Sequence, residues 1–288
     1  MQALRDPLTE VNESVKRVPV NGTTLSYIEK GNGEPVVFVH GAISDLRIWL
    51  NQVDFFSNSY RAISYSRRGH WPDQQVEDGP PYSRSVHAED LAGFLKALDL
   101  GKVHLVGHSF GGAIALLTAL QHPELVASLV LGEPSPFVDL LDDSEINLIS
   151  KQRVGFEEAY LLAKGGNSEA AIRQFLKTIV GADVLDQLPP AARVAVIDNA
   201  STLAPMLERY FVSPPLSCGQ LSSVTAPTLL ISGEFSPTIA VRSNGRLNNC
   251  LPNSADATMH SVSHGLHIES PDGFNQLVLD FLKVVSPV

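Results

Sequence analysis

The sequence has little cysteine, no cluster of basic residues and no long apolar segment. Cys218 and Cys250 are its only cysteines and form no CxxC pair, so we expect ordinary thiols rather than a disulfide framework or a thiolate metal site. Lysine and arginine number 21 against 31 aspartates and glutamates, and this net charge of −10 disfavours a nucleic-acid partner. No run approaches the roughly 18 apolar residues of a membrane span, and the first residues lack the apolar core of a signal peptide. We therefore predict a cytoplasmic protein without a membrane partner.

Short apolar runs, each bounded by glycine or proline, recur along the chain. Their near-continuous valine, leucine and isoleucine content is typical of strands that helices cover on both faces. They occupy residues 35–41, 61–66, 102–108, 126–133 and 226–234. Residues 85–100 and 272–285 instead place apolar side chains at helical spacing, and Ser270-Pro271 is a typical helix start. This alternation predicts a mostly parallel α/β sheet flanked by helices.

The alternation stops between residues 136 and 219, where only helical patterns occur. They cover residues 144–166, 168–181 and 189–211, with breaks at Pro189-Pro190 and Pro214-Pro215. A helical insertion between two strands is best interpreted as a cap over the edge of the sheet. We predict an α/β core of residues 1–135 and 220–288 and a helical cap of residues 136–219.

The segment Gly107-His108-Ser109-Phe110-Gly111 fits the G-x-S-x-G pattern of a nucleophile elbow and lies between a predicted strand and a predicted helix. Such a sharp turn crowds the residues two before and two after the serine, so side chains at positions 107 and 111 would clash. The start of the helix adds a positive dipole where negative charge develops during acyl transfer. These features predict Ser109 as a nucleophile.

Upstream, His40-Gly41 ends the predicted strand of residues 35–41. The loop after this strand can supply one of the two backbone N–H groups of an oxyanion hole, and the residue after the nucleophile supplies the other. We predict Ala42 and Phe110 as these donors. His40 itself is expected to be structural, because it sits at a strand end and Ser109 is already the predicted nucleophile.

Three histidines follow near the C-terminus, His260, His264 and His267. Paired zinc ligands at this spacing normally share a helix face, whereas Val262 and Gly265 indicate a strand and a loop, so we expect no metal. His264, at the predicted junction of strand and loop, is the candidate general base. His267 is the alternative.

The elbow, the His40-Gly41 loop, the helical insertion and the late histidines together resemble the α/β-hydrolase fold. The specific resemblance, over about residues 18–285 and weakest in the cap, is to the capped family of epoxide hydrolases, haloalkane dehalogenases, meta-cleavage hydrolases and many carboxylesterases. "YSRRGHWPD", residues 65–73, is similar to the family's loop after the fourth strand, and "SHGLHIESPDGF" to its histidine loop, where the first histidine is catalytic. This favours His264. Because the epoxide hydrolases and dehalogenases carry aspartate at the elbow, Ser109 implies an acyl-serine intermediate.

The catalytic acid is missing from its usual place. The family's acid follows the seventh strand, yet Ser236 stands where an aspartate is expected. Glu133 ends the strand after the elbow helix, at the same sheet edge as Ser109, and some members of the fold resemble this by carrying a glutamate after the sixth strand. We predict Glu133 as the acid and Glu234 as the alternative. A salt bridge is the ordinary role of such a carboxylate.

The resemblance implies a cofactor-free serine hydrolase that cleaves a carboxylic ester or a lactone through an acyl-enzyme. Two alternatives stay open: a C–C bond hydrolase of the meta-cleavage type, and a small-molecule receptor on a hydrolase scaffold. The apolar cap predicts a small, apolar substrate. Candidate binding residues, which fit the cap's own core equally well, are Trp71, Phe137, Tyr160, Met206 and Tyr210. The oligomeric state has no signal in the sequence.

Overall fold

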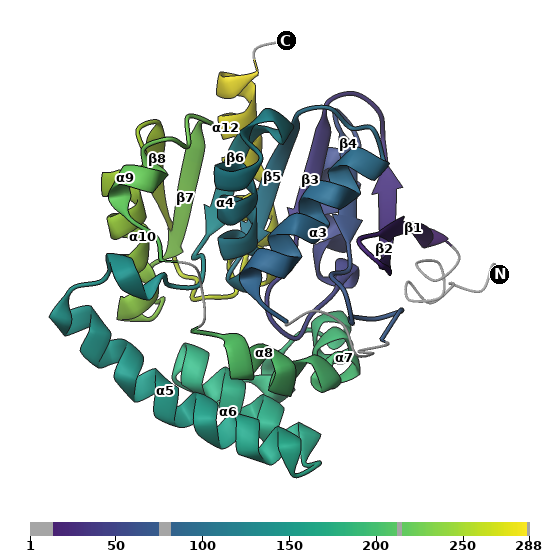
Figure 1. Ribbon diagram of the computed structural model, residues 1–288. Helices are drawn as coiled ribbons and strands as arrows, with labels where there is room; N and C mark the ends of the chain where they lie inside the picture. Colours follow the sequence, from purple (N-terminus) through teal and green to yellow (C-terminus); the bar gives the residue numbers. More distant parts are fainter. Residues whose placement is uncertain (1–13, 75–81, 212–214, 287–288) are drawn as a thin grey trace.

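The computed structural model describes residues 14–74, 82–211 and 215–286, which form one mixed sheet flanked by helices (Figure 1). The eight strands of these residues run in the order β1-β2-β4-β3-β5-β6-β7-β8. β1 pairs antiparallel with β2 and β2 with β4, and every other described pair is parallel, which confirms the predicted sheet. The strands are β1 Lys16–Val20, β2 Thr23–Lys30, β3 Pro35–Val39, β4 Arg61–Tyr65, β5 Val103–His108, β6 Val126–Gly132, β7 Thr228–Gly233 and β8 Ser254–Met259.

Helices cover both faces of this sheet and bury a separate apolar core on each. Figure 1 shows α3, α4 and α10 in front of the strands and α12 behind them. α2 packs on the same side as α12, because the buried side chains of both helices belong to one core. The helices of the core region are α2 Leu50–Phe56, α3 Arg84–Ala97, α4 Phe110–Gln121, α9 Cys218–Leu221, α10 Thr238–Cys250, α11 Leu266–Glu269 and α12 Pro271–Val285.

Between β6 and α9 the described chain forms helices but no strand, and Figure 1 shows this segment below the sheet. Its first helix starts at a capping box, in which the Asp142 side chain accepts from the Glu145 N–H and Glu145 accepts from the Asp142 N–H. The helices are α5 Asp143–Lys164, α6 Ser168–Val180, α7 Pro190–Asp198 and α8 Leu203–Arg209. The boundaries at residues 136 and 219 stay a prediction.

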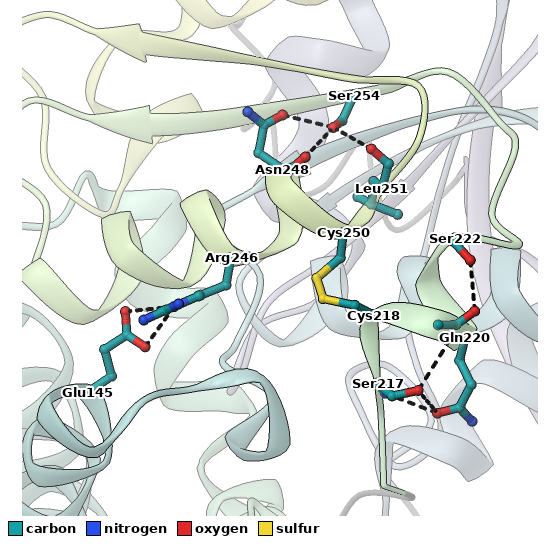
Figure 2. The surroundings of a disulfide bond; sticks show 11 residues. Glu145, Ser217, Cys218, Gln220, Ser222, Arg246, Asn248, Cys250, Leu251 and Ser254 are labelled. Carbon is teal, nitrogen blue, oxygen red and sulfur yellow. Dashed lines mark hydrogen bonds and ion pairs between the residues drawn. A yellow bond between two sulfur atoms is a disulfide. The ribbon is translucent and has the colours of Figure 1, made fainter.

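Polar contacts anchor this helical segment to the core at two places. Arg246 in α10 pairs with Glu145 in α5 at 3.0 Å (Figure 2). At the other end, Asn199 Nδ2 donates to buried Asp45 at 2.6 Å, and Asp45 also pairs with Arg47 at 2.6 Å. The Arg47 guanidinium lies 3.9 Å from the centroid of the Trp71 ring, whose backbone N–H donates to Asn199. Trp71 is therefore part of an anchor between segment and core.

The prediction of two ordinary thiols is wrong, because the structure joins Cys218 and Cys250 in a disulfide. The bond connects the first residue of α9 to the last residue of α10 (Figure 2). No spacing motif signals this pair. The two cysteines meet only because β7 and α10 bring the chain back beside α9.

Candidate active site

Ser109 stands at the turn between β5 and α4 with φ 54° and ψ −120°, a strained conformation for a residue with a side chain. A Cβ at Gly107 would lie 2.7 Å from the Gly111 carbonyl oxygen, and a Cβ at Gly111 would lie 2.2 Å from the Val39 carbonyl oxygen. Only glycine fits at either position, as the sequence indicated. The turn therefore presents Ser109 at the carboxyl edge of the parallel strands.

His264 lies in the loop after β8, between Ser109 and Glu133. Its Nε2 is 3.1 Å from Ser109 Oγ, and its Nδ1 is 2.5 Å from Glu133 Oε2. His108 Nε2 donates at 2.7 Å to the carbonyl oxygen of His264 and so holds the loop. Burial, together with the neighbouring His264, lowers the pKa of His108 to about 3, so that its imidazole stays neutral. The three residues predicted as a triad thus form one hydrogen-bond chain.

The other two histidines of this region lie elsewhere. His267 is buried and stacks on Trp49, with ring centroids 3.9 Å apart, and neither of its ring nitrogens has a hydrogen-bond partner among the described residues. Burial lowers the pKa of His267 well below its usual range. His260 is exposed and lies 3.4 Å from Glu234. Of the described histidines, therefore, His264 is the one hydrogen-bonded to Ser109.

Glu133 follows β6 directly and has a positive φ of 45°. Its side chain is fully buried, and its Oε1 accepts from the Gly233 N–H at 2.8 Å. Burial acts to raise the pKa of Glu133, but the hydrogen bond and charge of His264 and the hydrogen bond from the Gly233 N–H together lower it. The carboxylate therefore stays ionised at neutral pH, with one oxygen toward the imidazole.

Glu234, the alternative acid, points away from the imidazole. Its carboxylate accepts from the Ser261 N–H at 2.9 Å and lies beside His260, and its side chain is 44% exposed. No hydrogen bond within the described chain joins Glu234 to His264. The serine at the expected acid position, Ser236, has a buried hydroxyl without a hydrogen-bond partner among the described residues.

The loop after β3 lies against the nucleophile, since a Cβ on Gly41 would be 3.6 Å from the Cβ of Ser109. Ala42 follows in this loop, and Phe110 opens α4. Within the described residues neither backbone N–H donates to a protein acceptor. Two available donors near the serine are what an oxyanion hole requires. Their assignment to that role stays a prediction.

A buried guanidinium, which the sequence analysis missed, supports this loop from behind. Arg67 Nη2 donates at 2.8 Å to the Gly41 carbonyl oxygen, and the Arg67 backbone N–H donates at 3.0 Å to His40 Nε2. No carboxylate of the described residues pairs with Arg67, and burial lowers its pKa to about 9. It still carries its charge at neutral pH, 5.0 Å from the centroid of the Phe110 ring. His40 holds the loop, which is the structural role predicted for it.

A cavity of about 30 Å³ adjoins Ser109, Glu133 and His264. Of the predicted binding residues, Tyr210 lines this cavity. Phe137 and Met206 are buried elsewhere in the core, Trp71 contacts Arg47, and Tyr160 lies half-buried in α5. These four do not border the cavity, and their role in binding stays a prediction. Further residues that line it are Pro134, Ser135, Pro136, Gln152, Ile179, Pro237, Ile239 and Ala240.

No group of three or more histidine, cysteine, aspartate or glutamate residues in the described ranges of the chain could hold a metal ion. None of the helices in the same ranges is both long enough and apolar enough to cross a membrane.

The family model of the alpha/beta hydrolase fold matches residues 34–273. The chain belongs to the α/β-hydrolase fold family. This α/β hydrolase is 31% identical over 280 residues to a 2-hydroxy-6-oxononadienedioate/2-hydroxy-6-oxononatrienedioate hydrolase of Dechloromonas aromatica, covering 90% of each chain. It is 26% identical over 276 residues to a 2-(acetamidomethylene)succinate hydrolase of Mesorhizobium japonicum, covering 93% of this chain and 94% of that protein.

Solved structures show the same fold for this α/β hydrolase. The enol-lactonase of Burkholderia xenovorans matches with a TM-score of 0.77 at 21% identity, over 93% of this chain and 100% of that one. Est816, described as an N-acyl homoserine lactone degrading enzyme, matches with a TM-score of 0.68 at 26% identity, over 92% and 100% of the two chains.

Proposed function

We propose that this α/β hydrolase cleaves a carboxylic ester or a lactone of a small molecule through an acyl-enzyme formed on Ser109. The observation that carries the proposal is the hydrogen-bond chain from Ser109 Oγ through His264 to the buried Glu133 carboxylate. A serine hydroxyl is a weak nucleophile, and a histidine held in the correct tautomer by a carboxylate activates it. The hydrogen-bond chain supplies the serine, the histidine and the carboxylate in that order.

The proton path follows from these contacts. Glu133 accepts from His264 Nδ1–H, so Nε2 carries the lone pair that faces Ser109 Oγ. As Oγ attacks the substrate carbonyl, Nε2 takes the hydroxyl proton, and it then returns that proton to the leaving alkoxide oxygen. Water attacks the acyl-serine with the same base, and the proton returns to Ser109 as the acid product leaves. The buried carboxylate stabilises the imidazolium in both steps.

We assign the N–H groups of Ala42 and Phe110 to bind the carbonyl oxygen that becomes negative during the attack. Two observations support this assignment. The loop that holds Ala42 lies beside Ser109, and Phe110 stands at the start of α4, where the helix dipole is positive. Arg67 adds a fixed positive charge behind the same loop without touching the substrate. We further propose that residues 136–219 act as a cap over this site, because Gln152, Ile179 and Tyr210 from that segment close the cavity.

The direct test is the variant Ser109→Ala on p-nitrophenyl hexanoate. We expect loss of nearly all turnover, by roughly 10⁴-fold or more, because the covalent step disappears. The matched control is Ser150→Ala, which removes an exposed hydroxyl on α5 whose one hydrogen bond to the described residues is to the Ile146 carbonyl. It should retain the wild-type rate. Unchanged turnover in Ser109→Ala would show that the serine is not the nucleophile.

A second candidate is hydrolysis of a C–C bond in a vinylogous diketone. It is supported by relatives named for such substrates, at 31% identity in Dechloromonas aromatica and 28% in Pseudomonas putida. The same serine, histidine and acid would serve that reaction. Turnover of a 2-hydroxy-6-oxo-2,4-dienoate, compared with hexanoate and lactone substrates on one enzyme preparation, separates the two. Preference for the dienoate by kcat/KM would replace the ester proposal.

A further inference from the structure

Three polar side chains outside the proposed triad line the cavity beside Ser109. Ser135 follows Glu133 by two residues, Gln152 lies in α5, and Tyr210 directly follows α8. The proton path described above uses none of them. Their presence divides the wall into a polar part and the apolar part formed by proline, isoleucine and alanine.

Ser135 and Tyr210 form a buried pair of hydroxyls. Ser135 Oγ lies 3.1 Å from Tyr210 Oη, and the two residues are 2% and 4% exposed. Two hydroxyls carry two hydrogens, but a bond between them uses only one. Neither hydroxyl has another hydrogen-bond partner in the described parts of the chain. A buried donor left unpaired is unfavourable, so this pair is prepared for an acceptor that enters the cavity.

The surroundings of the pair favour an electron-rich acceptor. Buried Arg84 donates from Nη1 to the Pro136 carbonyl oxygen at 3.0 Å, and its Cζ lies 5.4 Å from the centroid of the Tyr210 ring. The positive charge of Arg84 therefore lies close to Tyr210 and attracts a partly negative oxygen that enters the cavity. Burial raises the pKa of Tyr210, so its hydroxyl keeps the hydrogen it can donate. Gln152 adds an amide on the same cavity.

The backbone fixes this pair close to the reacting atoms. The Ser135 N–H donates at 3.0 Å to the Ser109 carbonyl oxygen, so Ser135 is tied to the nucleophile's own backbone. Of the two halves of an ester, the acyl group is the one that stays attached to Ser109 after the alcohol has left. A pair this close to Ser109 is within reach of the acyl chain in both half-reactions.

We propose that the Ser135–Tyr210 hydroxyl pair selects substrates whose acyl chain carries a hydrogen-bond-accepting oxygen, such as an ether, ketone or carboxylate oxygen. The inference rests on the proposed ester or lactone hydrolysis and names its substrate class. It also revises the expectation of a purely apolar substrate, because the apolar residues form only part of the wall around the triad.

An oxygen scan tests this selection. The substrates are p-nitrophenyl hexanoate and three analogues in which an ether oxygen replaces the methylene at position 3, 4 or 5. Each kcat/KM is divided by the rate constant of the same ester with hydroxide, which removes differences in intrinsic reactivity. We expect one oxygen position to exceed hexanoate by roughly fivefold in the wild type, the worth of one neutral hydrogen bond.

The variants are Tyr210→Phe, Ser135→Ala and their combination, with Tyr60→Phe as a matched loss of a tyrosine hydroxyl in the opposite core. The oxygen preference is the ratio of kcat/KM for an ether analogue to that for hexanoate in the same variant. The single variants should each lose part of this preference, and the double variant should lose all of it. Tyr60→Phe should keep the full preference. Circular dichroism melting curves report whether each variant folds.

The outcomes separate the two proposals. If the wild type turns over hexanoate but prefers none of the three ether analogues, the inference is overturned while the proposed function stands. This outcome needs no variant. An oxygen preference that survives in the folded double variant would also overturn it. Failure of the wild type to turn over any of the four esters would overturn the proposed function, and the inference with it.

Discussion

Replacing Glu133 with glutamine changes one buried oxygen to an amide NH₂, and the structure determines which one. Oε1 accepts from the Gly233 N–H at 2.8 Å and must remain an oxygen, since an NH₂ there would place two donors face to face. The amide NH₂ then faces His264 Nδ1, 2.5 Å from the present Oε2. It can only donate, so Nδ1 becomes the acceptor and the ring proton moves to Nε2. Nε2–H now faces Ser109 Oγ and cannot take its proton.

The wrong tautomer and the lost charge together should be costly. The corresponding acid-to-amide change in a serine protease triad lowers kcat by about 10⁴, which corresponds to roughly 5 kcal/mol in the barrier. We expect a loss of roughly 10³ to 10⁴ in kcat/KM for Glu133→Gln. The matched variant is Glu234→Gln, because its amide oxygen still accepts from the Ser261 N–H on a side chain that is 44% exposed. It should stay within about twofold of the wild type.

The assay is steady-state turnover of p-nitrophenyl hexanoate at pH 8, with melting curves to confirm that both variants fold. Less than a tenfold loss in Glu133→Gln would refute the assignment of the acid, as would a larger loss in Glu234→Gln. A second readout is acid stability. The folded pKa of Glu133 is lowered, so its contribution to stability is present above its unfolded pKa of about 4.5 and is lost as the pH falls through the folded value. Glu133→Gln should flatten that acid limb.

Two further predictions concern the structure around the site. His267→Phe replaces a buried imidazole whose nitrogens lack partners in the described residues, so the urea midpoint should rise at pH 7.5. The gain should grow at pH 5.5, because the unfolded histidine binds a proton below about 6.5 and the folded one does not; an equal or smaller gain would contradict this. Titration of denatured, unreduced protein should find no free thiol, and two thiols would disprove the bond between Cys218 and Cys250.

Much of the fold could be predicted from the sequence, because the patterns that indicate its strands lie within short segments. The five apolar runs correspond to β3, β4, β5, β6 and β7, which are nearly all buried and therefore lack polar alternation. β1 and β2 were not predicted, and the strand expected directly before His264 lies earlier, as β8 at Ser254–Met259, with Val262 outside it. These three strands lie toward the two edges of the sheet, and exposed residues interrupt β1 and β8. Their pairing partners rather than their composition make them strands.

The elbow and the candidate base could be predicted from the sequence. The clash that requires glycine at 107 arises within the turn itself, whereas the clash at 111 is with the backbone of Val39 and His40 at the end of the neighbouring strand. The motif still indicated Ser109, and the histidine loop pointed to His264. The other contacts of the site depend on how distant segments pack. The tertiary structure placed Glu133 rather than Glu234 against the imidazole, bonded Cys218 to Cys250 and brought Ser135 to Tyr210, 75 positions away. Such contacts are set by how strands and helices pack, because a local pattern does not encode which distant side chain will face a buried polar group.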